Sequence, residues 1–182
     1  MMNIPNMLSL LRLALLPVLF TFFYWQFPYH YAACTGVIIL IGLSDFFDGY
    51  LARRWNQTSR FGAFIDPVAD KIAVAMAYIL VVEHYQSLWI TLAAIIIIGR
   101  EISISALREW MGTEGKGQII AVSPIGKWKT TLQMWSVGGL FLVPDLDYFP
   151  FTVFIGLCLF AATGLTVISM IDYFAAAWKK LI

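Results

Sequence analysis

The prediction of the fold starts from residues 45–70, which read DFFDGYLARRWNQTSRFGAFIDPVAD. This stretch carries four aspartates in a chain of 182 residues that is 60% hydrophobic and only 13% charged. A soluble domain typically has about 25% charged residues. An ionised carboxylate at the centre of a membrane helix costs about 2.5–3.5 kcal/mol, so a group of them needs a compensating cation. The composition therefore predicts an integral membrane protein, and the aspartates predict a divalent-metal site within it.

Six apolar stretches predict an all-α bundle of six transmembrane helices. They cover residues 13–27, 32–43, 72–82, 88–99, 132–143 and 149–171. Several are shorter than the ~20 residues that cross a hydrocarbon core, so polar residues must complete them. We expect the second helix to continue through Asp45, the third to begin near Asp66 and the fourth to continue through Arg100. Because lipid excludes such residues, their polar halves should face one another across a cavity.

Lys and Arg are distributed unequally between the two ends of the predicted bundle. Nine of them lie at or near the ends on the side of the amino terminus, whereas residues 27–31, 83–87 and 144–150 contain none. This asymmetry predicts a cytoplasmic amino terminus and a polar cavity that faces the cytoplasm. Residues 1–12 are polar on one side, which predicts an interfacial helix before the first span. No separate domain is indicated, so residues 1–182 are expected to form one membrane domain.

The spacing of the aspartates predicts how they meet. Asp45 and Asp48 are three residues apart and Asp66 and Asp70 are four apart, so each pair lies on one face of a helix. The two helices are antiparallel neighbours with a short connection, which lets the pairs converge. Four carboxylates can hold one or two Mg²⁺ or Mn²⁺ ions, because these hard cations prefer oxygen ligands. Asp66 directly precedes Pro67, a pair that predicts the cap of the third helix.

Small residues and an arginine accompany the aspartates. Gly49, Ala52 and Gly62 each lie within four residues of an aspartate, where they allow a ligand or another helix to approach the backbone. Helix packing alone is the alternative explanation for each of them. Arg53 follows Asp45 by eight residues on a similar helix face, where its guanidinium can bind phosphate oxygens beside the metals.

The whole pattern of residues 45–70 resembles the signature of a known family. It reads Asp, two residues, Asp-Gly, two residues, Ala-Arg, eight residues, Gly, three residues, Asp, three residues, Asp. This is similar to the CDP-alcohol phosphotransferases, and NIPN, REISISALREWM and GKWKTT extend the similarity over most of the chain. The resemblance implies transfer of the phosphatidyl group from CDP-diacylglycerol to sn-glycerol 3-phosphate, giving phosphatidylglycerophosphate and CMP. It also implies two Mg²⁺ or Mn²⁺ ions, a homodimer and the bacterial inner membrane.

The same resemblance implies roles for individual residues. Asp45, Asp48 and Asp66 would bind metal, and Asp70 would be both a ligand and the general base. The residues expected to contact CDP-diacylglycerol are Pro5, Asn6, Asp48, Gly49, Ala52, Arg53, Ser59 and Gly62. No obvious Ser, Cys or His nucleophile accompanies the acids, so we expect direct attack without a covalent enzyme intermediate.

The phosphate of the acceptor needs cations that the aspartates do not provide. Arg100, Arg108 and Lys127 are the best candidates. Arg100 lies deep in the fourth predicted span, where an unpaired guanidinium is costly. Its alternative role is an ion pair with an acid such as Glu101 or Asp172. Arg108 and Lys127 lie nearer the surface, where a solvated charge explains them almost as well.

Two other functions remain open at this point. The first is the same chemistry with another alcohol, such as inositol phosphate or serine, because the motif residues are expected to recognise only the CDP part of the lipid substrate. The second is a divalent-cation transporter, which the sequence disfavours because every candidate ligand lies in the cytoplasmic half. The net charge of +1 gives no indication of nucleic-acid binding. Cys34 and Cys158 lie in apolar runs and are expected to be small buried side chains.

Overall fold

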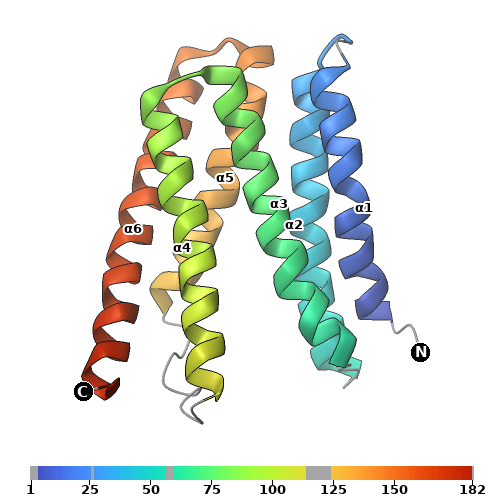
Figure 1. The fold of residues 1–182 in the computed structure, drawn as a ribbon. Helices are drawn as coiled ribbons and strands as arrows, with labels where there is room; N and C mark the ends of the chain where they lie inside the picture. The colour runs from blue at the N-terminus through green and yellow to red at the C-terminus, as the bar shows by residue number, and fades with distance from the viewer. Residues whose placement is uncertain (1–3, 26, 56–59, 114–123, 182) are drawn as a thin grey trace.

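A computed structural model describes residues 4–25, 27–55, 60–113 and 124–181 of the chain, and every regular element in these ranges is an α-helix. The helices are α1 (Ile4–Tyr24), α2 (His30–Trp55), α3 (Arg60–Tyr85), α4 (Leu88–Thr113), α5 (Pro124–Leu146) and α6 (Phe149–Leu181). They run up and down in one bundle, with both ends of the chain at the lower edge of Figure 1. The predicted all-α class is confirmed.

Four of these helices contain a stretch long and apolar enough to cross a membrane. The stretches are Met7–Tyr24 in α1, His30–Phe47 in α2, Leu88–Gly112 in α4 and Phe149–Ala176 in α6. Large apolar side chains such as Ile39, Ile95 and Phe160 are more than half exposed. Ser9 and Arg12, in contrast, are fully buried. A surface that is apolar outside and polar residues inside are typical of a helical membrane protein.

The connections at the upper end of the bundle are short and share one conformation. Tyr29, Gln86 and Asp147 have φ angles of 62°, 45° and 43°, in the left-handed region that often ends a helix. Asp145 Oδ2 accepts a hydrogen bond of 2.7 Å from the Ala32 amide, which joins the end of α5 to the start of α2. The upper connections make α1 and α2, α3 and α4, and α5 and α6 antiparallel neighbours, and the polar residues of α2 and α3 lie at the opposite end.

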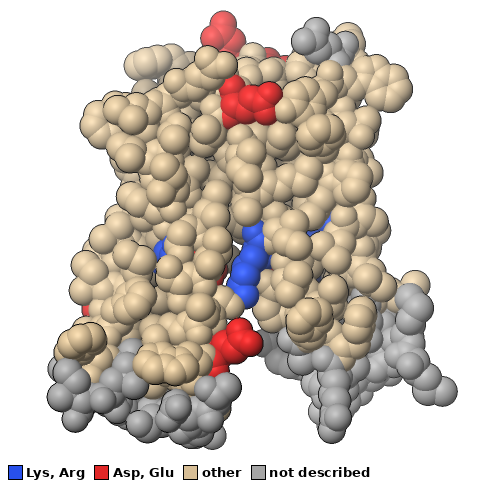
Figure 2. All heavy atoms as spheres, viewed as in Figure 1, with Lys and Arg blue, Asp and Glu red and all other residues tan. Residues whose placement is uncertain are grey.

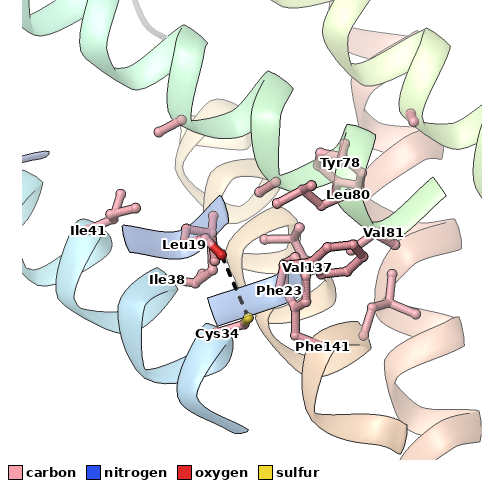
Figure 3. Packing of buried hydrophobic residues seen from close by; sticks show 14 of the residues in the cluster. Leu19, Phe23, Cys34, Ile38, Ile41, Tyr78, Leu80, Val81, Val137 and Phe141 are labelled. Atoms are coloured by element: carbon pink, nitrogen blue, oxygen red, sulfur yellow. Dashed lines mark hydrogen bonds between the residues drawn. The ribbon is translucent and has the colours of Figure 1, made fainter. Parts of the chain in front are cut away.

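The main hydrophobic core takes most of its residues from α1, α2, α3 and α5, and buried residues of α4 and α6 complete it. Figure 3 shows Leu19, Ile38, Tyr78 and Val137, one each from α1, α2, α3 and α5, in this cluster. Cys34 lies in this cluster, with its thiol 3.9 Å from the Leu19 carbonyl oxygen. Both cysteines are buried and free, as predicted. The core holds all six helices together in this part of the bundle and so determines where their lower, polar halves lie.

The helix ends differ from the sequence prediction in three places. Residues 4–24 form one continuous helix, so no separate interfacial helix precedes residue 13 among the described residues. The prediction that Asp66 caps the third helix is wrong, because α3 begins at Arg60 and Pro67 lies inside it. Pro67 is the eighth residue of α3 and has no amide N–H, so one hydrogen bond of the helix is missing there. α4 also extends to Thr113, well past Arg100, through which it was expected to continue.

α5 and α6 approach each other closely at Gly139. A Cβ atom placed at this position would lie 2.1 Å from Ile155 Cδ1 and 2.6 Å from Ile155 Cγ1. Ile155 is fully buried, so its side chain can give way only by displacing other core residues. We therefore expect Gly139→Ala to lower the free energy of unfolding by about 1–3 kcal/mol, as overpacking usually does.

Thermal unfolding of the purified protein in detergent measures this effect. Gly164→Ala on α6 is the matched control, because no atom lies within 4 Å of the added methyl group. The control should unfold at the wild-type temperature or above it, since alanine favours a helix over glycine by roughly 0.5–1 kcal/mol. Equal melting temperatures for the two variants would contradict the close approach.

Candidate functional site

Three of the four motif aspartates lie together at the lower end of the bundle. Asp45 lies on α2, and Asp66 and Asp70 lie in the second and third turns of α3. Each of the three contacts a side chain of α1. Asp48 also belongs to α2, but its side chain is outside the described part. The predicted convergence of carboxylates from the second and third helices is therefore seen for three residues.

Arg12 joins two of these carboxylates. Its Nη1 donates a hydrogen bond to Asp70 Oδ1, and its Nη2 lies 3.3 Å from Asp45 Oδ1. The Arg12 side chain is only 1% exposed, whereas those of Asp45 and Asp70 are 60% and 46% exposed. One buried guanidinium thus bridges α2 and α3 from the side of α1. Its positive charge offsets part of the repulsion between the two carboxylates.

Ser9 provides the third contact, one turn earlier on the same face of α1. Its hydroxyl donates a hydrogen bond to Asp66 Oδ1. The sequence analysis placed Ser9 and Arg12 in an interfacial helix and did not predict their contacts with the aspartates of residues 45–70. The signal was present, because an arginine in an apolar stretch is as costly as an aspartate and needs a partner of opposite charge.

A cavity of about 260 Å³ opens beside the aspartates, between α2, α3, α4 and α5. Its polar lining consists of Asp45, Asp70, Lys71, Glu101, Thr130 and Gln133. Its other walls are mostly apolar, with Ile38, Ala77 and Val137 among them. Figure 2 shows a hollow in the lower half of the molecule, with Lys or Arg atoms inside it and Asp or Glu atoms below. The expected polar cavity between the helices is therefore present.

Lys71 is a cation of this cavity that sequence reasoning did not select. It follows Asp70 directly, and its Nζ donates a hydrogen bond to Ser105 Oγ on α4. The contact joins α3 to α4 beside the cavity, where Glu101 of α4 also contributes to the lining. A positive charge next to Asp70 can attract an anionic substrate towards that carboxylate.

The predicted acceptor-binding arginines lie on the face of α4 that is turned towards α6. Arg100 Cζ is 5.5 Å from the centre of the Tyr173 ring, and Arg108 Cζ is 5.7 Å from it. Arg100 is buried, and its Nη1 lies 3.0 Å from Glu101 Oε1, which confirms the ion pair considered as an alternative. Its buried Nε has no hydrogen-bond partner in the described part of the chain. The side chain of Lys127 lies outside that part.

The structure gives only the backbone position of most residues predicted to contact CDP-diacylglycerol. The helices α1 and α2 contain six of them, whose surroundings are outside the described part: Pro5, Asn6, Asp48, Gly49, Ala52 and Arg53. Ser59 lies outside the described residues altogether. Gly62 is described and is buried in α3, one turn before Asp66. The roles of these residues stay predictions.

The acidic residues suit a hard divalent cation in their donor chemistry. They supply carboxylate oxygens, which Mg²⁺ and Mn²⁺ prefer, and Asp45 and Asp70 are near enough for one guanidinium to contact both. Among the described residues, no three Asp, Glu, His or Cys side chains are close enough to hold an ion by themselves. The side chain of Asp48 is not among those residues. Within the described part of the chain, Asp45 and Asp70 are therefore the best candidates for metal ligands.

The histidines lie at the other end of the bundle. His30 begins α2, and His84 lies in the last turn of α3. Tyr31 Oη is 2.8 Å from His84 Nδ1, so an aromatic cluster joins these two helices at the upper connections. This placement separates both histidines from the aspartates.

Known proteins are similar to this protein along nearly the whole chain. A family model described as CDP-alcohol phosphatidyltransferase matches residues 2–175. A protein of Yersinia enterocolitica is 49% identical over 183 residues, covering 100% of this chain and 98% of its own length. Proteins of Yersinia pestis and Salmonella choleraesuis are each 48% identical, covering 98% and 97% of their own lengths. All three carry the name CDP-diacylglycerol–glycerol-3-phosphate 3-phosphatidyltransferase.

Proposed function

Because the chain belongs to the CDP-alcohol phosphatidyltransferase family, we propose that it transfers the phosphatidyl group of CDP-diacylglycerol to sn-glycerol 3-phosphate. The products are phosphatidylglycerophosphate and CMP. The observation that carries this proposal is the identity of about 48% along the whole chain to enzymes named for the reaction. The convergence of Asp45, Asp66 and Asp70 beside a polar cavity supports it independently.

The proposed arrangement in the membrane has six spans and an active site facing the cytoplasm. The aspartates lie at the same end of the bundle as the amino terminus. The connections at the other end contain no Lys or Arg, which favours the outer side of a bacterial inner membrane for them. The whole chain is proposed to act as one domain and to form a homodimer, which crosslinking in membranes would test.

In the proposed mechanism, Asp70 is the general base. Its carboxylate lines the cavity and takes the proton of the glycerol hydroxyl while that oxygen attacks the lipid-side phosphorus. The new P–O bond forms as the bond to CMP breaks, so no enzyme side chain is phosphorylated. Two Mg²⁺ or Mn²⁺ ions held by Asp45, Asp48, Asp66 and Asp70 would neutralise charge on the pyrophosphate. Arg53 would bind the same phosphates as a guanidinium fork.

Cations of α4 and α5 are proposed to hold the phosphate of the acceptor. Arg100 and Arg108 lie at the same Tyr173 ring, so their charges add on one side of α4. Glu101 pairs with Arg100 and also lines the cavity, which places Arg100 one residue behind the cavity wall. Lys127 would contribute from α5, and Lys71 is a further candidate because it lines the cavity.

The test is a transfer assay with purified enzyme in detergent and labelled CDP-diacylglycerol. Glycerol 3-phosphate should give phosphatidylglycerophosphate and CMP, whereas inositol phosphate and serine should give no lipid product. Absence of product with glycerol 3-phosphate would refute the proposal. Release of CMP in detergent, where no ion gradient exists, also separates the enzyme from a cation transporter.

Arg100→Lys tests the proposed acceptor site. Lysine keeps the charge but cannot bind phosphate through two N–H groups or stack on Tyr173 in the same way. We expect KM for glycerol 3-phosphate to rise about tenfold, which corresponds to about 1.4 kcal/mol, while KM for CDP-diacylglycerol changes less than about twofold. Initial rates over a matrix of both substrate concentrations measure this. Equal changes in the two KM values would assign Arg100 to structure instead.

A further inference from the structure

We propose that Arg12 is the positioning residue of the active site, which holds the carboxylates of Asp45 and Asp70 in fixed relative directions. The proposal rests on the phosphatidyl transfer proposed above, because it states how the base of that reaction is held. Arg12 acts through the two aspartates and not on the substrate. Asp45 and Asp70 line the cavity, and Arg12 contacts them from the side of α1.

The burial of Arg12 is the first observation behind this proposal. It is the largest fully buried side chain in the described residues, and it sits in a helix whose apolar stretch can span a membrane. A buried guanidinium is stable only when carboxylates or other acceptors compensate its charge. The two described carboxylates that contact it, those of Asp45 and Asp70, belong to residues 45–70. The energy that keeps Arg12 buried therefore depends on the geometry of the active site.

The geometry of the contacts is the second observation. Two different nitrogens of one planar guanidinium reach Oδ1 of Asp45 and Oδ1 of Asp70, which belong to different helices. Nη1 donates a hydrogen bond to Asp70, and Nη2 forms an ion pair of 3.3 Å with Asp45, so one rigid, planar group contacts both carboxylates at once. The ammonium group of a lysine is a point charge on a flexible stem and restrains two partners less well. Arg12 thus restrains the two carboxylates relative to each other.

The exposure of the aspartates explains why such a residue is needed. Their side chains are 60% and 46% exposed, so packing against neighbours restricts their rotamers only in part. A catalytic group that is displaced by about 1 Å loses on the order of 100-fold in rate. Ser9 supports the same function, since it contacts Asp66 from the same face of α1. Side chains of α1 therefore orient the acidic residues of α2 and α3.

The experiment compares Arg12→Met and Arg12→Lys with the wild-type enzyme. Arg12→Met should lower kcat about 100-fold, while KM for each substrate changes less than about threefold. The kcat of Arg12→Lys should be about tenfold higher than that of Arg12→Met, because lysine supplies the positive charge but not the planar guanidinium. Arg100→Met is the matched comparison, since Arg100 is the other arginine found buried among the described side chains, and its loss should mainly raise KM for glycerol 3-phosphate.

A second readout does not depend on catalysis. Mn²⁺ added without substrate should give an electron paramagnetic resonance spectrum that is broadened in Arg12→Met and closer to the wild type in Arg12→Lys. Failure of the wild-type enzyme to make phosphatidylglycerophosphate would refute the proposed function, and the Mn²⁺ spectra would still test Arg12. If Arg12→Met does not fold, Arg12→Lys decides alone, with an expected kcat about tenfold below the wild type.

Three results would overturn the proposal. The first is a kcat of either variant within about twofold of the wild type. The second is a fall in the kcat of Arg12→Met that is accompanied by changes in both KM values and in the melting temperature, with no higher kcat in Arg12→Lys. This pattern would indicate a structural role. The third is a set of Mn²⁺ spectra that are identical in the wild type and both variants.

Discussion

Asp70→Asn is expected to lower kcat by at least about 1,000-fold, the largest effect of any single substitution proposed for this protein. Asparagine has nearly the same volume as aspartate, but it carries no charge and accepts no proton. The substitution therefore removes the base and weakens metal binding in one step. General-base catalysis alone contributes about 100- to 10,000-fold in typical enzymes.

The variant should still fold and bind CDP-diacylglycerol. An asparagine Oδ1 can accept the hydrogen bond that Arg12 Nη1 gives to Asp70 Oδ1, and Asp45 continues to compensate the charge of Arg12. Melting temperature and binding of labelled CDP-diacylglycerol measure these two properties. A variant that retains its full turnover would refute the assignment of Asp70 as the base.

Asp147→Asn is the matched control for this experiment. Asp147 is exposed at the upper connection between α5 and α6, at the opposite end of the bundle from Asp70. Its φ angle of 43° is one that asparagine adopts readily. The control therefore makes the same chemical change without backbone strain, and its turnover should equal that of the wild type.

The sequence predicted the helices and the acidic residues well, because both follow from the energetics of polar groups in lipid. Short apolar runs had to be completed by polar residues, and α2 and α4 do continue through Asp45 and Arg100. Asp45 of α2 and Asp70 of α3 contact the same guanidinium, which agrees with the predicted convergence of acidic residues from the second and third helices. Helix ends were less predictable, since Pro67 is tolerated within α3.

The contribution of α1 was not predicted, because it depends on contacts between residues far apart in the chain. Ser9 and Asp66 are 57 positions apart, and Arg12 and Asp70 are 58 apart. Helical periodicity gives the face of each residue on its own helix, but not which faces of different helices meet. The partner of Arg100 shows the same limit, since Tyr173 reaches it from α6. Such pairs follow from packing of the whole bundle.

The second large effect concerns the metal. Treatment with a chelator is expected to abolish transfer, and added Mg²⁺ or Mn²⁺ should restore it. The proposed reaction brings a pyrophosphate and a second phosphate to a site where Asp45, Asp66 and Asp70 already lie and where Asp48 is expected, so the negative charge must be offset. Arg12 supplies a single positive charge for Asp45 and Asp70 together, which is not enough for that purpose. Activity that survives complete chelation would contradict a metal-dependent mechanism.

Titration with Mn²⁺ in the absence of substrate determines how many ions the site holds. Electron paramagnetic resonance of free Mn²⁺ should show about two bound ions per chain, because two dications balance four carboxylates. Asp66→Asn removes one of these carboxylates and should weaken or eliminate one bound ion, whereas Asp147→Asn should bind as the wild type does. A single bound ion in the wild type would refute the two-ion arrangement. Equal binding in all three proteins would show that Asp66 is no ligand, and Ser9 would then contact a carboxylate of purely structural importance.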